Sequence, residues 1–80
     1  MADIILFTKN DCGKCEYVKE RLPPGLEVYV QNVDTAGGLA EGAFYGILGK
    51  GFPVLVVDEE FAAEGSINVL KRLKEIAGEK

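Results

Sequence analysis

The sequence predicts a single α/β domain, a four-stranded mixed sheet with three flanking helices in the order β-α-β-α-β-β-α. Three observations support this prediction. Short β-prone apolar runs alternate with stretches of helical spacing. Clusters of glycine and proline separate these segments. The 80 residues, 48% of them hydrophobic, suit one compact core, so we expect residues 1–80 to form one domain.

The chain opens with a predicted strand followed by a helix. Residues 4–8 are a continuous apolar, β-prone run, which is typical of a central strand buried on both faces. A helix is predicted over residues 13–22, and Pro23 ends it because proline cannot continue a helix. Residues spaced three and four apart form the inner face of this helix: Cys15, Val18 and Leu22.

A second strand is predicted over residues 26–31, where apolar and polar side chains alternate. Its more buried face carries Leu26, Val28 and Val30. Because a strand-helix-strand connection within one sheet is right-handed, we expect the first two strands to lie parallel.

Residues 32–38 read as a loop, and a second helix is predicted over residues 39–48 and expected to end at Gly49-Lys50-Gly51. Glycines recur every fourth residue at Gly38, Gly42 and Gly46. They lower the intrinsic helix propensity by about 1 kcal/mol each relative to alanine. The same glycines form a stripe without side chains along one face, where another backbone can approach closely. The sequence therefore leaves two alternatives open, a helix of marginal stability or a helix that packs closely against another backbone.

The last third of the chain predicts a hairpin and a helix. Residues 54–57 form the third strand, a turn at Asp58-Glu59 follows, and residues 60–63 pair antiparallel as the fourth. Ser66 reads as the N-cap of the final helix. The inner face of that helix is expected to carry Ile67, Leu70, Leu73 and Ala77.

Composition and charge exclude several functions. The net charge is -4, so there is no overall positive field to attract nucleic acid. Histidine is absent, which excludes Ser-His-Asp and Cys-His nucleophiles and histidine-bearing zinc sites. No apolar stretch approaches the roughly 20 residues that span a membrane. The start of the chain lacks the basic segment of a secretory signal, so a cytoplasmic protein is expected.

The two cysteines, Cys12 and Cys15, are three residues apart at the start of the first predicted helix. Residues i and i+3 of a helix have Cβ atoms roughly 5 to 6 Å apart, and a disulfide needs Cα atoms about 4.4 to 6.8 Å apart. The pair can therefore open and close without unfolding the chain. In a reducing compartment, such a pair is catalytic or metal-binding more often than a structural crosslink.

The position of Cys12 at the helix start favours its thiolate form, because unpaired backbone N–H groups point toward it. Lys9 and Lys14 favour the same charged form, and Asp11 opposes it. We therefore expect Cys12 to be the nucleophile and Cys15, one turn further on, to be the resolving thiol.

The element order, the Cys-x-x-Cys after the first strand and the proline before the third resemble the glutaredoxin branch of the thioredoxin fold. The resemblance covers the whole chain. Phe7-Thr8-Lys9 is similar to the step that precedes glutaredoxin dithiols, and Gly51-Phe52-Pro53 takes the place of the family's Thr-Val-Pro.

This resemblance implies that Pro53 is cis and faces the dithiol, and that the protein is a thiol-disulfide oxidoreductase acting on protein disulfides. Phe52 would offer its backbone to a bound peptide strand and its ring to apolar contact, although plain core packing also explains its ring. Lys9 and Lys14 complete the expected substrate-binding set. Tyr17 lines the site or is simply a half-buried helix residue.

Three departures from the family matter for the partner. Glu64 brings a negative charge to the stretch that helps hold glutathione in glutaredoxins, which favours thioredoxin reductase as the electron source. The dipeptide between the cysteines is Gly-Lys, unlike the Pro-Tyr of many glutaredoxins or the Gly-Pro of thioredoxins. Leu6 stands where thioredoxin has a buried aspartate, so the thioredoxin proton relay is missing.

Two other functions stay open. Structural zinc takes four ligands, so a metal or [2Fe-2S] site would need two copies of this chain, each giving two thiolates. A non-catalytic binding module of the same fold is the other alternative. Our principal expectation is a monomer that uses no cofactor.

Overall fold

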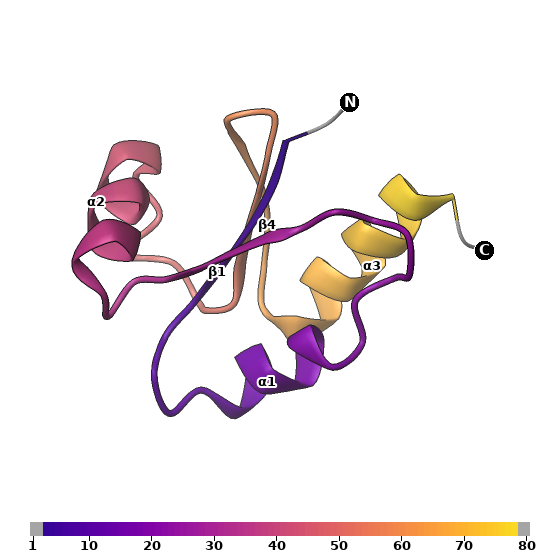
Figure 1. Cartoon of the computed structure of the whole chain (residues 1–80), viewed down its shortest axis with the longest axis horizontal. Helices are drawn as coiled ribbons and strands as arrows, with labels where there is room; N and C mark the ends of the chain where they lie inside the picture. The colour runs from indigo at the N-terminus through magenta and orange to yellow at the C-terminus, as the bar shows by residue number, and fades with distance from the viewer. Residues whose placement is uncertain (1–2, 79–80) are drawn as a thin grey trace.

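The computed structural model describes residues 3–78, which fold into the predicted order of seven elements (Figure 1). They are β1 (Ile4–Thr8), α1 (Gly13–Lys19), β2 (Tyr29–Asn32), α2 (Ala36–Tyr45), β3 (Val54–Val57), β4 (Glu60–Glu64) and α3 (Ser66–Ala77).

The four strands form one mixed sheet in the spatial order β2-β1-β3-β4. β1 runs parallel to β2 and antiparallel to β3, and β4 pairs antiparallel with β3. The predicted fold class and pairing directions are therefore confirmed. β1 is a central strand of the sheet, which explains why its residues 4–7 are all apolar.

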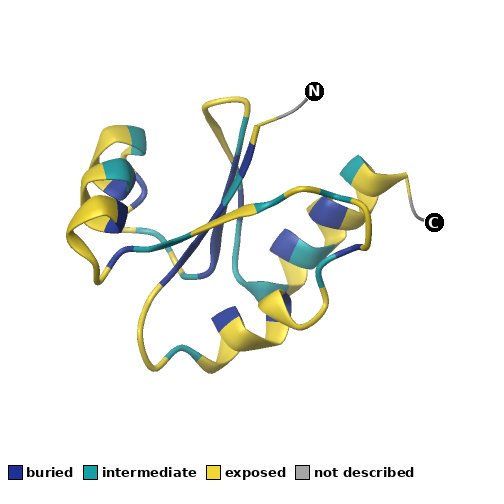
Figure 2. Cartoon of the chain, viewed as in Figure 1, coloured by how far each residue is buried: buried dark blue, intermediate teal, exposed yellow. Residues whose placement is uncertain are grey.

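Helices cover both faces of this sheet, and their buried sides face it (Figure 2). On one face, α1 and α3 pack over a core of Ile4, Leu6, Val18, Leu55, Ala63, Val69 and Leu73. On the other face, α2 and the segment after it cover a smaller core of Phe7, Val33, Ile47, Val54 and Val56. Consecutive residues of β3 thus alternate between two cores, as the period of a strand requires.

α1 is shorter than the predicted helix and ends at Lys19 instead of Leu22. The residue before a proline is disfavoured in helical conformation, so Leu22 cannot remain in the helix before Pro23. Leu22 nevertheless packs against the core beside α3.

β2 begins at Tyr29, later than predicted, and it is an edge strand. Val30 was predicted to be buried, but it is 45% exposed. The alternating pattern identified the strand correctly, whereas burial at the edge of a sheet depends on whether a helix covers it.

α2 occupies residues 36–45 instead of the predicted 39–48. Thr35 is its N-cap, because its hydroxyl oxygen accepts a hydrogen bond from the backbone N–H of Gly38 at 3.1 Å. Gly46, which was expected inside the helix, ends it with a φ of 69°. Ile47 is buried in the core from outside the helix.

Of the two alternatives left open for the glycines, the close approach of another backbone occurs at Gly38, whereas side chains pack against Gly42. A Cβ on Gly38 would overlap the backbone carbonyl of Asn32, and one on Gly42 would lie 2.8 Å from a methyl group of Leu48. Gly46 has open space around it, so it serves as a cap only.

The β3–β4 hairpin turns at Asp58 and Glu59, which both have positive φ, and β4 extends one residue further than predicted. Gly65, not Ser66, is the N-cap of α3, because its φ of 86° turns the chain from β4 into the helix. Ile67 was expected on the inner face of α3, but it is 80% exposed. Val69 and Leu73 are the fully buried residues of α3.

Within residues 3–78, no helix is both long and apolar enough to cross a membrane.

Candidate functional site

Cys12 and Cys15 form a disulfide with a Cα–Cα distance of 5.2 Å, inside the range that disulfides require. Cys12 is the N-cap of α1, in extended conformation, and Cys15 lies one turn into the helix. The backbone N–H of Cys15 donates a hydrogen bond to the sulfur of Cys12 at 3.1 Å. In the reduced protein the same N–H would meet a thiolate, and hydrogen bonds to charged acceptors are the stronger kind.

The two sulfurs differ in access. Cys12 is partly exposed, whereas Cys15 is completely buried. An incoming disulfide can therefore reach only Cys12 from solvent. The roles assigned to the two residues from the sequence remain predictions, and this difference in access supports them.

The loop before Cys12 is held by the end of the neighbouring parallel strand. The backbone N–H of Asn10 donates to the Asp34 carboxylate at 2.7 Å, and the side-chain amide of Asn32 donates to the Asn10 side-chain oxygen at 2.9 Å. Thr8 accepts a hydrogen bond from Val33 N–H at 2.9 Å through its backbone oxygen.

Asn10, Asn32 and Asp34 were not among the residues predicted for the site. The sequence does contain a pattern that could have identified them. Polar residues follow two strands that were expected to be parallel, and the carboxyl ends of parallel strands meet at one edge of the sheet.

The loop before β3 lies at the same end of the sheet as the dithiol loop (Figure 1). The Phe52–Pro53 peptide bond is cis, as the resemblance implied. Phe7 pairs with Val54 in the sheet, and continuing this antiparallel register brings Pro53 alongside Thr8, four residues before Cys12. Pro53 is buried.

Lys9 and Phe52 are brought together from these two loops. The Lys9 ammonium lies 5.8 Å from the centre of the Phe52 ring, in the range of a cation–π contact. The ring itself is half-buried and packs against the core under α2. Phe52 therefore does have the core-packing role that was the alternative interpretation, while Lys9 lies over its ring.

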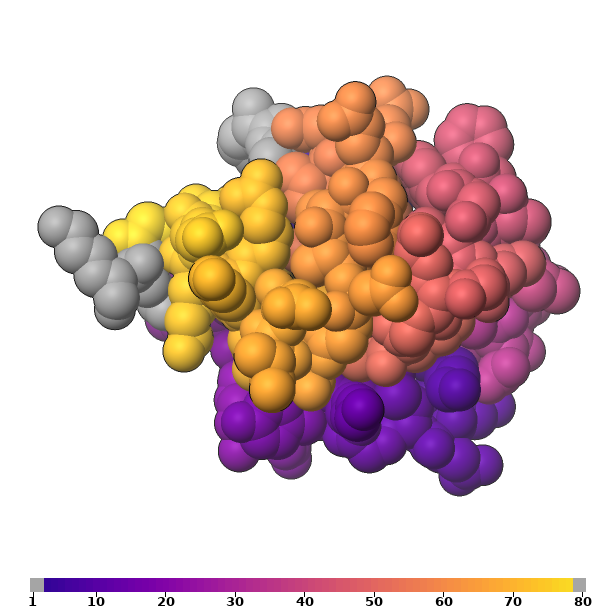
Figure 3. Space-filling model, turned by 180° about the vertical axis from the view of Figure 1, so that it is seen from behind, coloured from indigo at the N-terminus to yellow at the C-terminus, as the bar shows by residue number. Residues whose placement is uncertain are grey.

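Two hollows flank the start of α1. A polar one of about 430 Å³ includes Cys12 and carries charges of both signs: Lys9, Asp11, Glu16 and Lys19. A second, of about 370 Å³, is lined by Gly13, Lys14, Tyr17, Ser66 and Ile67, so it lies between α1 and α3. From behind, these two helices form one continuous surface (Figure 3).

Lys14 and Tyr17 are therefore on the α3 side of the dithiol, and Lys9 is on the side of the proline loop. Tyr17 is 45% exposed, which agrees with either of the roles proposed for it. Ile67 is the residue that the sequence analysis missed here, since its helical spacing suggested the core.

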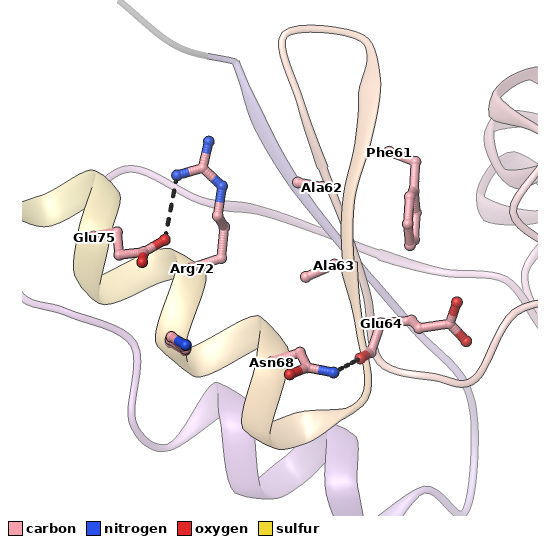
Figure 4. Close-up of a pocket in the computed structure, with 8 residues that line it drawn as sticks. Phe61, Ala62, Ala63, Glu64, Asn68, Arg72 and Glu75 are labelled. Atoms are coloured by element: carbon pink, nitrogen blue, oxygen red, sulfur yellow. Dashed lines mark hydrogen bonds and ion pairs between the residues drawn. The ribbon is translucent and has the colours of Figure 1, made fainter.

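A groove of about 480 Å³ between β4 and α3 contains neither cysteine (Figure 4). Its wall on α3 carries Asn68, Lys71, Arg72 and Glu75, and Arg72 and Glu75 form an ion pair at 3.6 Å. Size alone does not make this groove the reactive site, because it holds no nucleophile.

Among residues 3–78, no group of three or more Cys, Asp or Glu side chains is arranged to hold a metal ion.

Neither a protein-family model nor a curated protein matches this sequence. Solved structures do match. The thioredoxin-like protein BC3987 superimposes with a TM-score of 0.66 at 26% identity, over 89% of this chain and 99% of that one. Glutaredoxin 1 from Francisella tularensis, complexed with cacodylate, superimposes with a TM-score of 0.62 at 17% identity, over 99% of this chain and 100% of that one. With its dithiol at the start of α1 and a cis proline before β3, the chain has the thioredoxin fold that these two solved structures share.

Proposed function

We propose that this protein is a small dithiol-disulfide oxidoreductase that reduces disulfides in protein substrates. One observation carries the proposal: the two cysteines are at bonding distance, and only Cys12, at the helix start, is accessible. A structural crosslink does not need one partly exposed sulfur that lines a hollow at the surface.

The reaction is a pair of thiol-disulfide exchanges. The Cys12 thiolate attacks one sulfur of the substrate disulfide, which forms a mixed disulfide and releases the other substrate sulfur as a thiolate. Cys15 then attacks the Cys12 sulfur. The Cys12–Cys15 bond forms, the bond to the substrate breaks, and the substrate leaves with two more electrons. One of its thiolates takes the proton of Cys15, and the other takes a proton from water.

Two features of the structure support different roles for these sulfurs, with Cys12 attacking and Cys15 resolving. The N–H of Cys15 already points at the Cys12 sulfur, so it stabilises the attacking thiolate. The burial of Cys15 protects it from external disulfides until the mixed disulfide brings an electrophilic sulfur within its reach.

The oxidised protein has to regain two electrons, and we propose NADPH through thioredoxin reductase as their source, in preference to glutathione. Glu64 supports this choice. It stands where glutaredoxins have a glycine, and its negative charge would repel the anionic tripeptide glutathione from the position expected for it. Such a donor suits a reducing compartment such as the cytoplasm.

The deciding experiment follows NADPH oxidation with insulin as the disulfide substrate, with thioredoxin reductase in one series and glutathione plus its reductase in the other. Wild type should turn over in the first series. Cys12→Ser should abolish turnover, because no accessible nucleophile remains.

Cys15→Ser is the matched variant, since it removes one sulfur by the same change. It should accumulate a mixed disulfide with insulin, visible by mass spectrometry, and iodoacetamide should label Cys12 of the reduced wild type well before Cys15. Insulin reduction that survives in Cys12→Ser, or absence of turnover in both series, contradicts the proposal.

An inactive wild type would favour the two alternatives. A cluster or metal site shared by two chains needs both sulfurs at the surface, and the burial of Cys15 speaks against it. A non-catalytic binding module would show neither turnover nor a mixed disulfide.

A further inference from the structure

The proline loop is fastened to the junction of β4 and α3 by three hydrogen bonds. The N–H of Gly65 donates to the backbone oxygens of Gly51, at 3.1 Å, and Pro53, at 2.9 Å. In the opposite direction, the N–H of Gly51 donates to the side-chain carboxylate of Glu64 at 2.9 Å. Residues 64 and 65 therefore hold both ends of the loop.

Glu64 makes its two types of contact on opposite sides of the chain. Its backbone oxygen accepts a hydrogen bond from the Asn68 side chain at 3.2 Å, on the side of α3. Its carboxylate extends to the other side, away from α3 (Figure 4). The side chain thus points at the proline loop and not into the groove that its strand lines.

At its start the loop is also attached to β4, because the Lys50 ammonium lies 4.4 Å from the centre of the Phe61 ring. Gly49 and Gly51 have no side chains to pack, and the N–H of Lys50 donates to Ile47 within the same connection. Within the part of the chain that the structure describes, residues 64 and 65 make the hydrogen bonds that join residues 51–53 to another segment, apart from those of the β-sheet. The carboxylate supplies the one that fixes the N–H of Gly51.

These bonds leave the backbone of Phe52 free. Among residues 3–78, neither its N–H nor its oxygen has a hydrogen-bond partner, and an extended peptide uses such a pair of groups when it docks. We propose that Glu64 is a positioning residue, whose carboxylate holds Gly51 so that Phe52 keeps its backbone presented to the substrate strand. This inference rests on the proposed reduction of protein disulfides.

The hydrogen bond to Gly51 gives Glu64 a role beyond that of its charge. From the sequence, its charge was expected to disfavour the binding of glutathione, which is anionic. In the structure the carboxylate is an acceptor for a specific N–H, so its shape and acceptor atom matter as well as its charge. Glutamine separates the two effects, because its amide oxygen accepts the same bond without the charge.

The test compares Glu64→Ala, Glu64→Gln and, as a control on the same strand, Glu60→Ala, whose side chain is exposed. Two substrates are used: insulin, which docks through a peptide strand, and hydroxyethyl disulfide, which is neutral and too small to need the loop. The exchange rate of the Gly51 amide hydrogen, measured by NMR, reports the hydrogen bond directly. Thermal unfolding of each variant confirms that it is folded at the assay temperature.

For Glu64→Ala we expect faster exchange at Gly51 and a KM for insulin about twofold to tenfold higher, the range that corresponds to losing one hydrogen bond. The kcat with insulin and the kinetics with hydroxyethyl disulfide should stay within twofold of wild type. Glu64→Gln should restore slow exchange and the wild-type KM, and Glu60→Ala should resemble wild type. A purely structural role would not produce this split between substrates or the rescue by glutamine.

An unchanged insulin KM in Glu64→Ala overturns the inference, and so does a KM in Glu64→Gln as high as in Glu64→Ala, because the charge would then be the active property. A wild type that reduces neither substrate contradicts the proposed function instead, and the positioning role in catalysis is lost with it. The Gly51 exchange rates distinguish these cases, since they depend on the hydrogen bond and not on turnover.

Discussion

The two faces of the sheet are built differently. The face under α1 and α3 carries the larger core, with buried residues from both helices and three strands. The face under α2 has a smaller core, and α2 contributes to it mainly through the half-buried Tyr45 and two close-packed glycines. Large apolar side chains on the α2 side remain at the surface: Leu39, Phe44 and Leu48.

This difference shows how each helix is held in place. α3 is fixed by apolar burial, and it supports α1 and therefore the dithiol. α2 is fixed by its cap at Thr35 and by the close approach of Gly38 to the Asn32 backbone. The two cysteines thus stand on the face with the larger core, where Cys15 is completely buried.

The largest effect should come from the core under α3. Leu73 is fully buried, so Leu73→Ala should lower the free energy of unfolding by about 2 to 5 kcal/mol, through lost burial and the cavity that remains. Urea denaturation followed by circular dichroism measures it. Leu39→Ala on α2 is the control, since Leu39 is 50% exposed. Equal losses in the two variants would contradict the contrast between the faces.

On the face under α2, the largest loss of stability should come from substituting a glycine. Gly38→Ala should destabilise the protein by about 1 to 3 kcal/mol, because the added methyl group overlaps the Asn32 carbonyl. The adjacent Gly37→Ala should instead stabilise it by about 0.4 to 1 kcal/mol, since no atom lies within 4 Å of its Cβ position. The same urea titration compares them, and the opposite signs are the diagnostic result.

A third prediction separates stability from binding within α3. Ile67 is 80% exposed in the hollow beside Lys14 and Tyr17, so Ile67→Ser should change the free energy of unfolding by no more than about 0.5 kcal/mol. If protein substrates contact this hollow, its KM for insulin should rise about twofold to fivefold, as expected for losing part of an apolar contact.

Ile67→Leu, which keeps the apolar surface, is the matched control and should retain the wild-type KM. A serine variant with unchanged KM would remove Ile67 from the substrate surface.

The smallest effect concerns β2, at the edge where neither helix layer covers the sheet fully. The pKa of Tyr29 is raised above its ordinary value of 10.0, first because its hydroxyl donates a hydrogen bond to Glu27 at 2.7 Å and then because of the Glu27 charge. Glu27→Ala removes both the acceptor and the charge and should therefore lower this pKa toward 10.0, as measured by NMR titration of the tyrosine ring.

The sign for stability follows from the raised value. Because the folded state favours the neutral phenol, the contribution of Tyr29 is present below pH 10 and is lost as the pH rises through its folded pKa. Glu41→Ala, which alters the surroundings of Tyr45, should leave the Tyr29 titration in place. A Tyr29 pKa insensitive to Glu27→Ala would show that the hydrogen bond does not form in solution.

The sequence determined the features that depend on neighbours along the chain. The order of elements, the bounds of β1 and β3, the parallel first pair of strands and the Cys-x-x-Cys at the start of α1 all follow from local periodicity and turn residues. For the same reason, the residues of the dithiol could be chosen without coordinates. Their spacing alone places two sulfurs within bonding distance.

Only the tertiary structure decided which apolar residues are covered and which polar groups meet. Ile67 and Val30 fit the apolar periodicity, yet they are exposed because no other element lies over them. The bond between Glu64 and Gly51 joins segments 13 residues apart, and no local pattern encodes such a pairing. The physical reason is that burial and long-range hydrogen bonds are properties of the packed elements together, whereas propensity and spacing are properties of each element alone.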